Sequence, residues 1–104
     1  MRFVETPIFT ELVCKRLDDE DYRALQSTLM LRPEQGPVIP GSGGLRKIRW
    51  SAEGRGKRGG IRVIYFWDKR SLTFYMLYLY QKNEQGDLSA TQIRTLARLV
   101  REEF

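Results

Sequence analysis

Residues 72–80 constrain the fold of this 104-residue chain most strongly, because apolar or aromatic side chains dominate both of their alternating positions. A strand built from them would be buried on both faces and would therefore lie inside a sheet. Two further strand-like segments, 45–50 and 61–67, come before it. Three successive strands predict an antiparallel meander, with 72–80 as the central strand of the sheet.

Two helices are expected before the meander. Thr6 and Pro7 form a helix start, with threonine as the N-cap and proline at the first helical position. The acidic cluster 18–21 begins a second helix, since carboxylates in a first turn interact favourably with the positive end of the helix dipole. That helix must end by Arg32, because Pro33 disfavours a helical residue before it.

A third helix is expected at the end of the chain. Ser89 and Gln92 have the spacing of a capping box, and apolar residues of 93–104 fall on one helical face. Residues 1–5 form a short first strand. The order strand, helix, helix, three strands, helix predicts one α+β domain over residues 1–104. We expect an antiparallel sheet with the two N-terminal helices packed on one face. The other face is where an uncovered concave surface could remain.

Composition excludes several classes of chemistry. The sequence has no histidine, which removes His-dependent triads, His-ligated metal sites and imidazole acid–base catalysis. Cys14 is the single cysteine, so no intramolecular disulfide is possible, and a lone thiol suits a reducing compartment. No apolar run is long enough to span a membrane, and Glu5 and Pro7 interrupt the region where a signal peptide would be apolar. These features predict a cytoplasmic protein.

The positive charge is concentrated in the middle of the chain. Residues 41–70 hold nine Lys or Arg against Glu53 and Asp68, a net charge of +7. Residues 1–40 carry a net charge of −2 and residues 71–104 a net charge of 0. Clustered cations attract polyanions, which makes nucleic acid the expected partner; the alternative is a merely solubilising surface.

A glycine-rich segment, 54–59, matches the pattern G-x-G-x-x-G. A dinucleotide-binding fingerprint requires a helix after this pattern, whereas the residues that follow here are β-branched and aromatic. We therefore interpret the segment as a hairpin loop that carries three cations toward a phosphate backbone: Arg55, Lys57 and Arg58.

Lys47 and Arg49 project from one face of their strand, while Ile48 and Trp50 project from the other. If this strand pairs with the next one, Arg62 lies near both cations. Cations on an open sheet face are well placed to bind phosphates. The alternative is that Arg62 is an ordinary surface charge or the partner of a carboxylate.

Tyr78 and Tyr80 share a face at the end of the third strand, and Lys82 continues the same alternation. Tyr78 is expected to pack in the core. Tyr80 could equally pack in the core, stack on a base or donate a proton. Lys82 and Asn83 lie just past the strand, where a site would be.

This set of residues could cleave RNA without histidine, metal or another cofactor. RNA supplies the nucleophile, its 2′-OH; arginine and lysine can stabilise the phosphorane, and clustered cations lower the pKa of a neighbouring lysine. Such a site has weak acid–base groups, so something else must position the RNA.

At these residues the sequence resembles the RelE superfamily of type II toxin–antitoxin toxins, and most closely its HigB-like branch. The resemblance spans nearly the whole chain. The segments that carry it are 30–33, 38–49, 56–65, 80–84 and 87–88.

The resemblance implies a RelE-like fold and an mRNA interferase, an endoribonuclease that cuts message in the ribosomal A site. It places the scissile-phosphate arginine at Arg62, the basic pair at Lys47 and Arg49, and the lysine after the last strand at Lys82. Family members often have a further basic residue where this chain has Asn83.

Some relatives also use a tyrosine in the C-terminal helix, which this chain lacks, so Tyr80 is the substitute candidate for the general acid. Contacts to ribosomal RNA are expected from Arg46, Asn83 and the cations of 54–59.

The resemblance also implies a cognate antitoxin, commonly a helix-turn-helix protein, and we expect an acidic segment of it to cover the +7 block.

Two alternatives stay open. The superfamily includes ParE-like proteins that inhibit DNA gyrase without nuclease activity, and a degenerate member could act only as an antitoxin-binding module. Retention of the four basic residues favours the nuclease.

Overall fold

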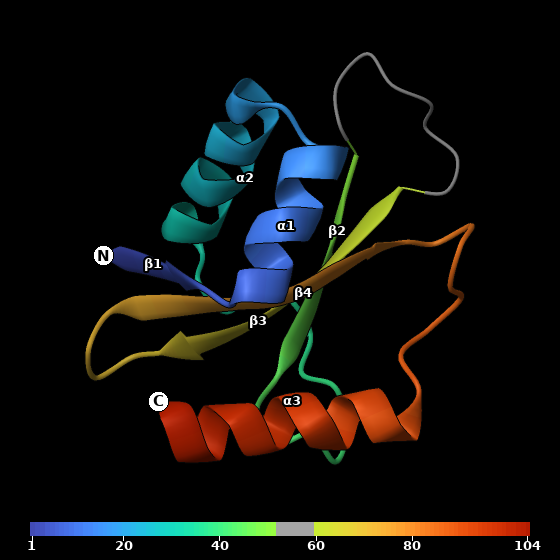
Figure 1. The fold of residues 1–104 in the computed structure, drawn as a ribbon. Helices are drawn as coiled ribbons and strands as arrows, with labels where there is room; N and C mark the ends of the chain where they lie inside the picture. Colours follow the sequence, from blue (N-terminus) through green and yellow to red (C-terminus); the bar gives the residue numbers. More distant parts are fainter. Residues whose placement is uncertain (52–59) are drawn as a thin grey trace.

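A computed structural model describes residues 1–51 and 60–104. The order of helices and strands is the predicted one (Figure 1). The elements are β1 (Arg2–Glu5), α1 (Pro7–Arg16), α2 (Asp19–Leu31), β2 (Arg46–Trp50), β3 (Ile61–Asp68), β4 (Thr73–Gln81) and α3 (Ala90–Glu103).

The helix starts agree with the sequence signals. The Thr6 side chain accepts a hydrogen bond from the backbone N–H of Phe9, and Asp18 caps α2 in the same way. Ser89 and Gln92 form both hydrogen bonds of a capping box at the start of α3. α2 ends at Leu31 with Arg32 as its C-cap, as the following proline requires.

The sheet is mixed, which corrects the expected antiparallel sheet. Its strand order is β1-β4-β3-β2. The meander of β2, β3 and β4 is antiparallel as predicted, and β4 lies in the interior. β1, however, pairs with β4 in parallel, because α1 and α2 carry the chain back across the sheet before the meander begins.

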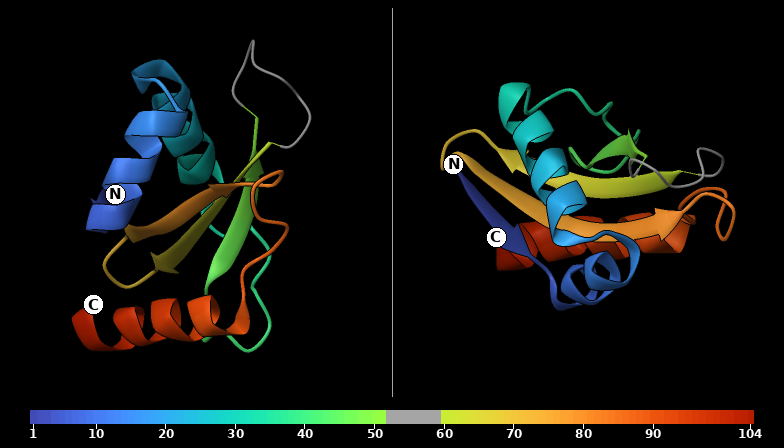
Figure 2. Two further views of the ribbon diagram at one scale, coloured as in Figure 1. Left: turned by 45° about the vertical axis from the view of Figure 1, so that its right-hand side comes forward. Right: turned by 90° about the horizontal axis from the view of Figure 1, so that it is seen from above.

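Both faces of the sheet bear a hydrophobic cluster. α1 and α2 cover one face, where Phe9, Leu25 and Leu29 are fully buried. α3 covers the other face and buries Leu96 and Ala97 against it (Figure 2). α3 therefore covers part of the second face, because its apolar stripe and the doubly apolar β4 must bury one another. The end of this face that carries Arg49 stays exposed.

The last strand contains a bulge. The pairing of β3 with β4 shifts between Ile64 and Tyr65, so that Ile64 pairs with Tyr78 and Tyr65 pairs with Met76. Leu77 has no opposite residue, and it packs toward α3 together with Tyr78 and Tyr80. None of the helices in the two described ranges is long and apolar enough to cross a membrane.

Candidate functional site

One row of side chains crosses three neighbouring strands. Arg49 of β2 pairs with Arg62 of β3, and Arg62 pairs with Tyr80 of β4. Directly paired residues project to the same side of a sheet, and Lys47 shares the side of Arg49 because it is two residues away. We call these four residues, Lys47, Arg49, Arg62 and Tyr80, the cationic face. The structure thus brings together the basic residues that the alternation of β2 suggested.

Arg62 is the most enclosed cation of this face, with 8% of its surface exposed. Its side chain lies against Gly60, which has a φ of +50°. A Cβ atom on residue 60 would lie 3.3 Å from Arg62 Nη1, so glycine leaves the space that the guanidinium uses. No ion pair of Arg62 occurs within the two described ranges. A guanidinium with little competing water can bind a phosphate strongly and through two parallel hydrogen bonds.

Tyr80 is 4% exposed, and its hydroxyl is buried without a hydrogen-bond partner among the described residues. Burial raises the pKa of this phenol; the charge of Asp87 raises it further, and that of Arg62 lowers it. Tyr80 is therefore protonated at neutral pH and can donate a proton but not accept one. Tyr78 packs in the cluster under α3, as expected, and donates a hydrogen bond to Gln85 Oε1 at 3.4 Å.

Asp87 brings an acidic side chain to the cationic face. Its Oδ1 lies 3.3 Å from Lys47 Nζ and also accepts a hydrogen bond from the backbone N–H of Leu88 at 2.9 Å. The Leu88 hydrogen bond and then that from Lys47 lower the pKa of Asp87. The sequence reasoning gave this residue no role, since no local pattern links Asp87 to Lys47 forty residues earlier.

Lys82 and Asn83 lie one and two residues beyond β4, and both are exposed. The backbone N–H of Lys82 donates to the carbonyl of Gly60 at 3.2 Å. This bond holds the start of the turn beside the first residues of β3, and therefore near Arg62.

Arg46 lies on the opposite side of β2 from Lys47. Its guanidinium donates to the carbonyl oxygens of Glu34 and Gly36 at 2.9 and 2.8 Å, so it braces the loop after α2. The alternation of β2 already groups Arg46 with Ile48 rather than with Arg49. The other expected RNA contacts, Arg55, Lys57 and Arg58, lie outside the described residues.

The site therefore combines three cations with a neutral phenol on one sheet face. Cations stabilise negative charge that develops on phosphate oxygens, and the phenol can protonate a leaving oxygen. Among the described residues, no three His, Cys, Asp or Glu side chains are grouped so that they could hold a metal ion.

Comparison with known proteins agrees with this architecture. A free-state structure of a mutant of the E. coli toxin RelE superposes with a TM-score of 0.60 at 12% sequence identity, covering 96% of this chain and 95% of that one. This likeness establishes that the two chains share one fold.

The family model described as "RelE toxin of RelE / RelB toxin-antitoxin system" matches residues 34–103, more than half of the chain. The chain belongs to this family of RelE toxins.

Proposed function

We propose that this toxin is a ribosome-dependent mRNA endoribonuclease that cuts message in the ribosomal A site. The observation that carries the proposal is the row formed by Arg49, Arg62 and Tyr80. It offers two guanidinium groups to one phosphodiester, and the buried Tyr80 hydroxyl beside them is the proposed proton donor once bound RNA reaches it. A toxin that only binds a protein target has no need for such cations to converge.

In the proposed reaction the 2′-oxygen attacks the adjacent phosphorus and the bond from phosphorus to the 5′-oxygen breaks. Lys47 in its amine form, or a water molecule, takes the proton from the 2′-OH, and Arg49 stabilises the negative charge that develops on the 2′-oxygen or holds the adjacent phosphate. Arg62 and Lys82 stabilise the phosphorane, and Tyr80 gives its proton to the leaving 5′-oxygen. The products are a 2′,3′-cyclic phosphate and a 5′-OH end, and no metal takes part.

The ribosome would supply the positioning that these groups lack. A phenol and lysines are weak acid–base catalysts at neutral pH, so orientation of the RNA must contribute much of the rate. Arg55, Lys57, Arg58 and Asn83 are the proposed contacts to ribosomal RNA. Arg46 is a weaker candidate than these, because carbonyl oxygens of the loop after α2 already occupy its guanidinium.

Within the family we place the chain in the HigB-like branch, on the sequence segments that carry that resemblance. We propose a helix-turn-helix antitoxin as its partner, with an acidic segment that covers the cationic face and neutralises it. Charge reversal at Lys47 and Arg49 should then weaken antitoxin binding. If binding is unchanged, neutralisation occurs at another surface.

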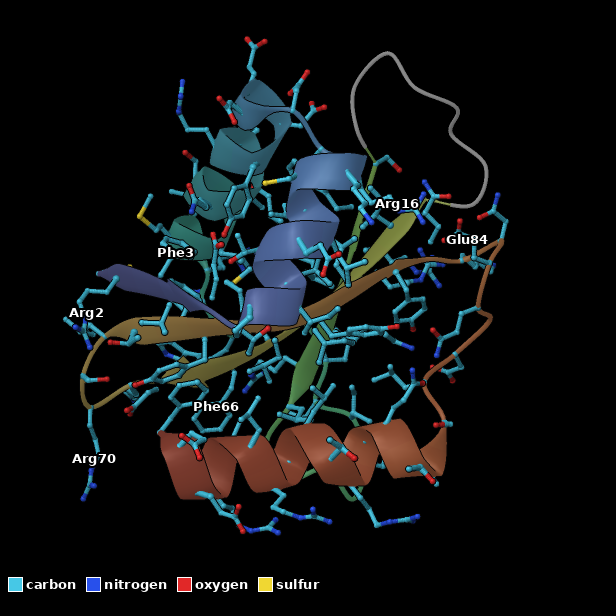
Figure 3. All side chains as sticks on the ribbon, viewed as in Figure 1. Arg2, Phe3, Arg16, Phe66, Arg70 and Glu84 are labelled. Carbon is cyan, nitrogen blue, oxygen red and sulfur yellow. The ribbon has the colours of Figure 1, made fainter. Side chains whose placement is uncertain are left out.

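The direct test is 5′-end mapping of a defined mRNA incubated with the purified protein, with and without translating ribosomes. New ends inside translated codons are expected only when ribosomes are present, and chelation of metal should not reduce them. Arg62→Ala should abolish cleavage and growth arrest while the protein stays folded. Arg70→Ala, at the opposite end of the sheet, is the matched control and should cut normally (Figure 3).

An unchanged message under both conditions would reject the nuclease. The remaining hypothesis would then be ParE-like inhibition of DNA gyrase, which a supercoiling assay detects. A protein inactive in both assays would be an antitoxin-binding module.

A further inference from the structure

A long-range ion pair joins α1 to the turn that follows β4. Arg16, the last residue of α1, donates from Nη2 to both carboxylate oxygens of Glu84 at 2.7 and 2.9 Å (Figure 3). The two residues are separated by 68 positions in the chain. The Arg16 side chain is 29% exposed, and its Nε is buried without a hydrogen-bond partner among the described residues. The guanidinium is therefore partly shielded from water, and the carboxylate that it pairs with among the described residues is that of Glu84.

The turn that Glu84 belongs to also carries Lys82. Only one described backbone bond, from Lys82 N–H to Gly60, attaches this turn to β3. The next two, from the N–H groups of Glu84 and Gln85, return to Gln81 and lie within the turn. Gln85 holds the later part of the turn through hydrogen bonds with Tyr78 and Gln92. For residues 82–84 the described side-chain hydrogen bonds are those between Glu84 and Arg16, so without them this first part of the turn could pivot about the end of β4.

The other end of the ion pair is rigid. α1 buries Phe9 and Val13 against the sheet, and its start is fixed by Thr6, whose hydroxyl donates to the carbonyl of Leu77 at 2.9 Å. Arg16 thus connects a packed helix to the turn two residues beyond Lys82. A partly exposed ion pair adds little to stability, but a charge-assisted hydrogen bond of 2.7 Å ties Glu84, and with it the turn, to the end of the helix.

We propose that Arg16 is a positioning residue, which acts through Glu84 to hold Lys82 at the distance from Arg62 that the scissile phosphate requires. This inference rests on the proposed nuclease function. Arg16 itself does not contact the reacting atoms. Because a displacement of about 1 Å can cost about 100-fold in rate, loss of this ion pair should slow the chemical step and leave ribosome binding intact.

The test compares Arg16→Ala and Glu84→Ala with the charge-swapped double variant R16E/E84R. Each variant is assayed as full-length protein for the single-turnover cleavage rate on mRNA bound to programmed ribosomes, and for ribosome affinity by co-sedimentation. Each alanine variant should cut about 10- to 100-fold more slowly with unchanged ribosome affinity. The swapped pair should cut at least several-fold faster than either alanine variant, because it restores the link between α1 and the turn.

Lys15→Ala is the matched control. Lys15 precedes Arg16 on the same helix and pairs with Glu11 at 3.7 Å, away from the turn. It should cut at the wild-type rate. Arg16→Gln covers the case in which an alanine variant fails to fold, since it keeps much of the side chain's packing but loses the charge, and it should also be slowed.

The outcomes separate the two proposals. If the wild-type protein cuts message and the Arg16 and Glu84 variants cut equally fast, the positioning role is overturned and the nuclease stands. A parallel loss of ribosome affinity would also overturn it, because Arg16 would then be an RNA contact. If the wild-type protein does not cut message at all, both proposals fail together.

Discussion

Asp87 Oδ1 accepts a hydrogen bond from Lys47 Nζ at 3.3 Å, so a carboxylate occupies part of the cationic face. The Asp87 side chain is 75% exposed, which makes the ion pair of little value for folding. Its larger effect is electrostatic, because the carboxylate and an approaching RNA phosphate compete for the same Lys47 ammonium. Asp87 therefore moderates the attraction of this face for RNA.

Replacement of Asp87 by asparagine should consequently strengthen RNA binding. We expect about a 2- to 5-fold gain in affinity for a short single-stranded RNA, the size of one exposed charge interaction, and the gain should shrink as salt is raised. Fluorescence anisotropy at two salt concentrations measures both effects. Glu103→Gln, which removes a charge at the end of α3, is the control. Weaker binding by Asp87→Asn would show instead that the carboxylate holds Lys47 in its binding position.

The same carboxylate predicts a small acid dependence of stability. The pKa of Asp87 is lowered from 3.8 in the folded protein, so the folded state binds this proton less readily than the unfolded state does. The ionised Asp87 carboxylate therefore makes its full contribution to the free energy of unfolding well above pH 3.8. This contribution is lost as the pH falls through the lowered pKa of the folded state. Exposure limits it to no more than about 1 kcal/mol. The free energies of unfolding of wild type and Asp87→Asn, measured in urea, should therefore differ most near neutral pH and converge as the pH falls below the folded pKa of Asp87.

Tyr80 and Tyr65 should respond in opposite ways to loss of the hydroxyl. The Tyr65 hydroxyl donates to the carbonyl of Pro33 at 2.8 Å and accepts from the N–H of Gly36 at 3.1 Å, whereas the buried Tyr80 hydroxyl has no described partner. Tyr65→Phe should cost about 1–3 kcal/mol of unfolding free energy. Tyr80→Phe should leave stability unchanged or raise it by about 1 kcal/mol, while it slows cleavage about 100-fold.

Urea unfolding and single-turnover cleavage, measured on both variants, check this contrast. A folded Tyr80→Phe protein that cuts at the wild-type rate would remove Tyr80 from proton transfer. A clear loss of stability in that variant would show that its hydroxyl is hydrogen-bonded after all.

Local sequence signals predicted the parts of this fold that local physics determines. The N-caps at Thr6 and Ser89 and the end of α2 before Pro33 each depend on a few neighbouring residues, and all agree with the structure. The position of Arg62 near Arg49 was also predictable, because consecutive strands of a meander pair with one another. The same alternation should have placed Arg46 on the far side of β2, where it braces a loop instead of joining the cations.

Contacts between distant segments could not be predicted in this way. The four residues of β1 carry no sign of whether they pair with β4 in parallel, about seventy positions later. The amphipathic stripe of α3 predicts burial but does not name the sheet face that buries it. The ion pairs of Glu84 and Asp87 depend on where the segment after β4 meets the end of α1 and strand β2. Each of the two residues therefore looks like an ordinary surface charge in the sequence.

Thr6 joins β1, α1 and β4 at one buried point, and its loss should be among the more damaging small changes in the chain. Its side chain is 5% exposed; the oxygen accepts from Phe9 N–H at 3.0 Å, and the hydroxyl donates to the Leu77 carbonyl at the β-bulge at 2.9 Å. Thr6→Ala leaves both backbone groups without this partner and should cost about 1–3 kcal/mol of unfolding free energy. Thr6→Ser keeps the hydroxyl and should recover most of that loss. Urea denaturation of the two variants measures the difference, and equal losses would assign the effect to the missing methyl group rather than to the hydrogen bonds.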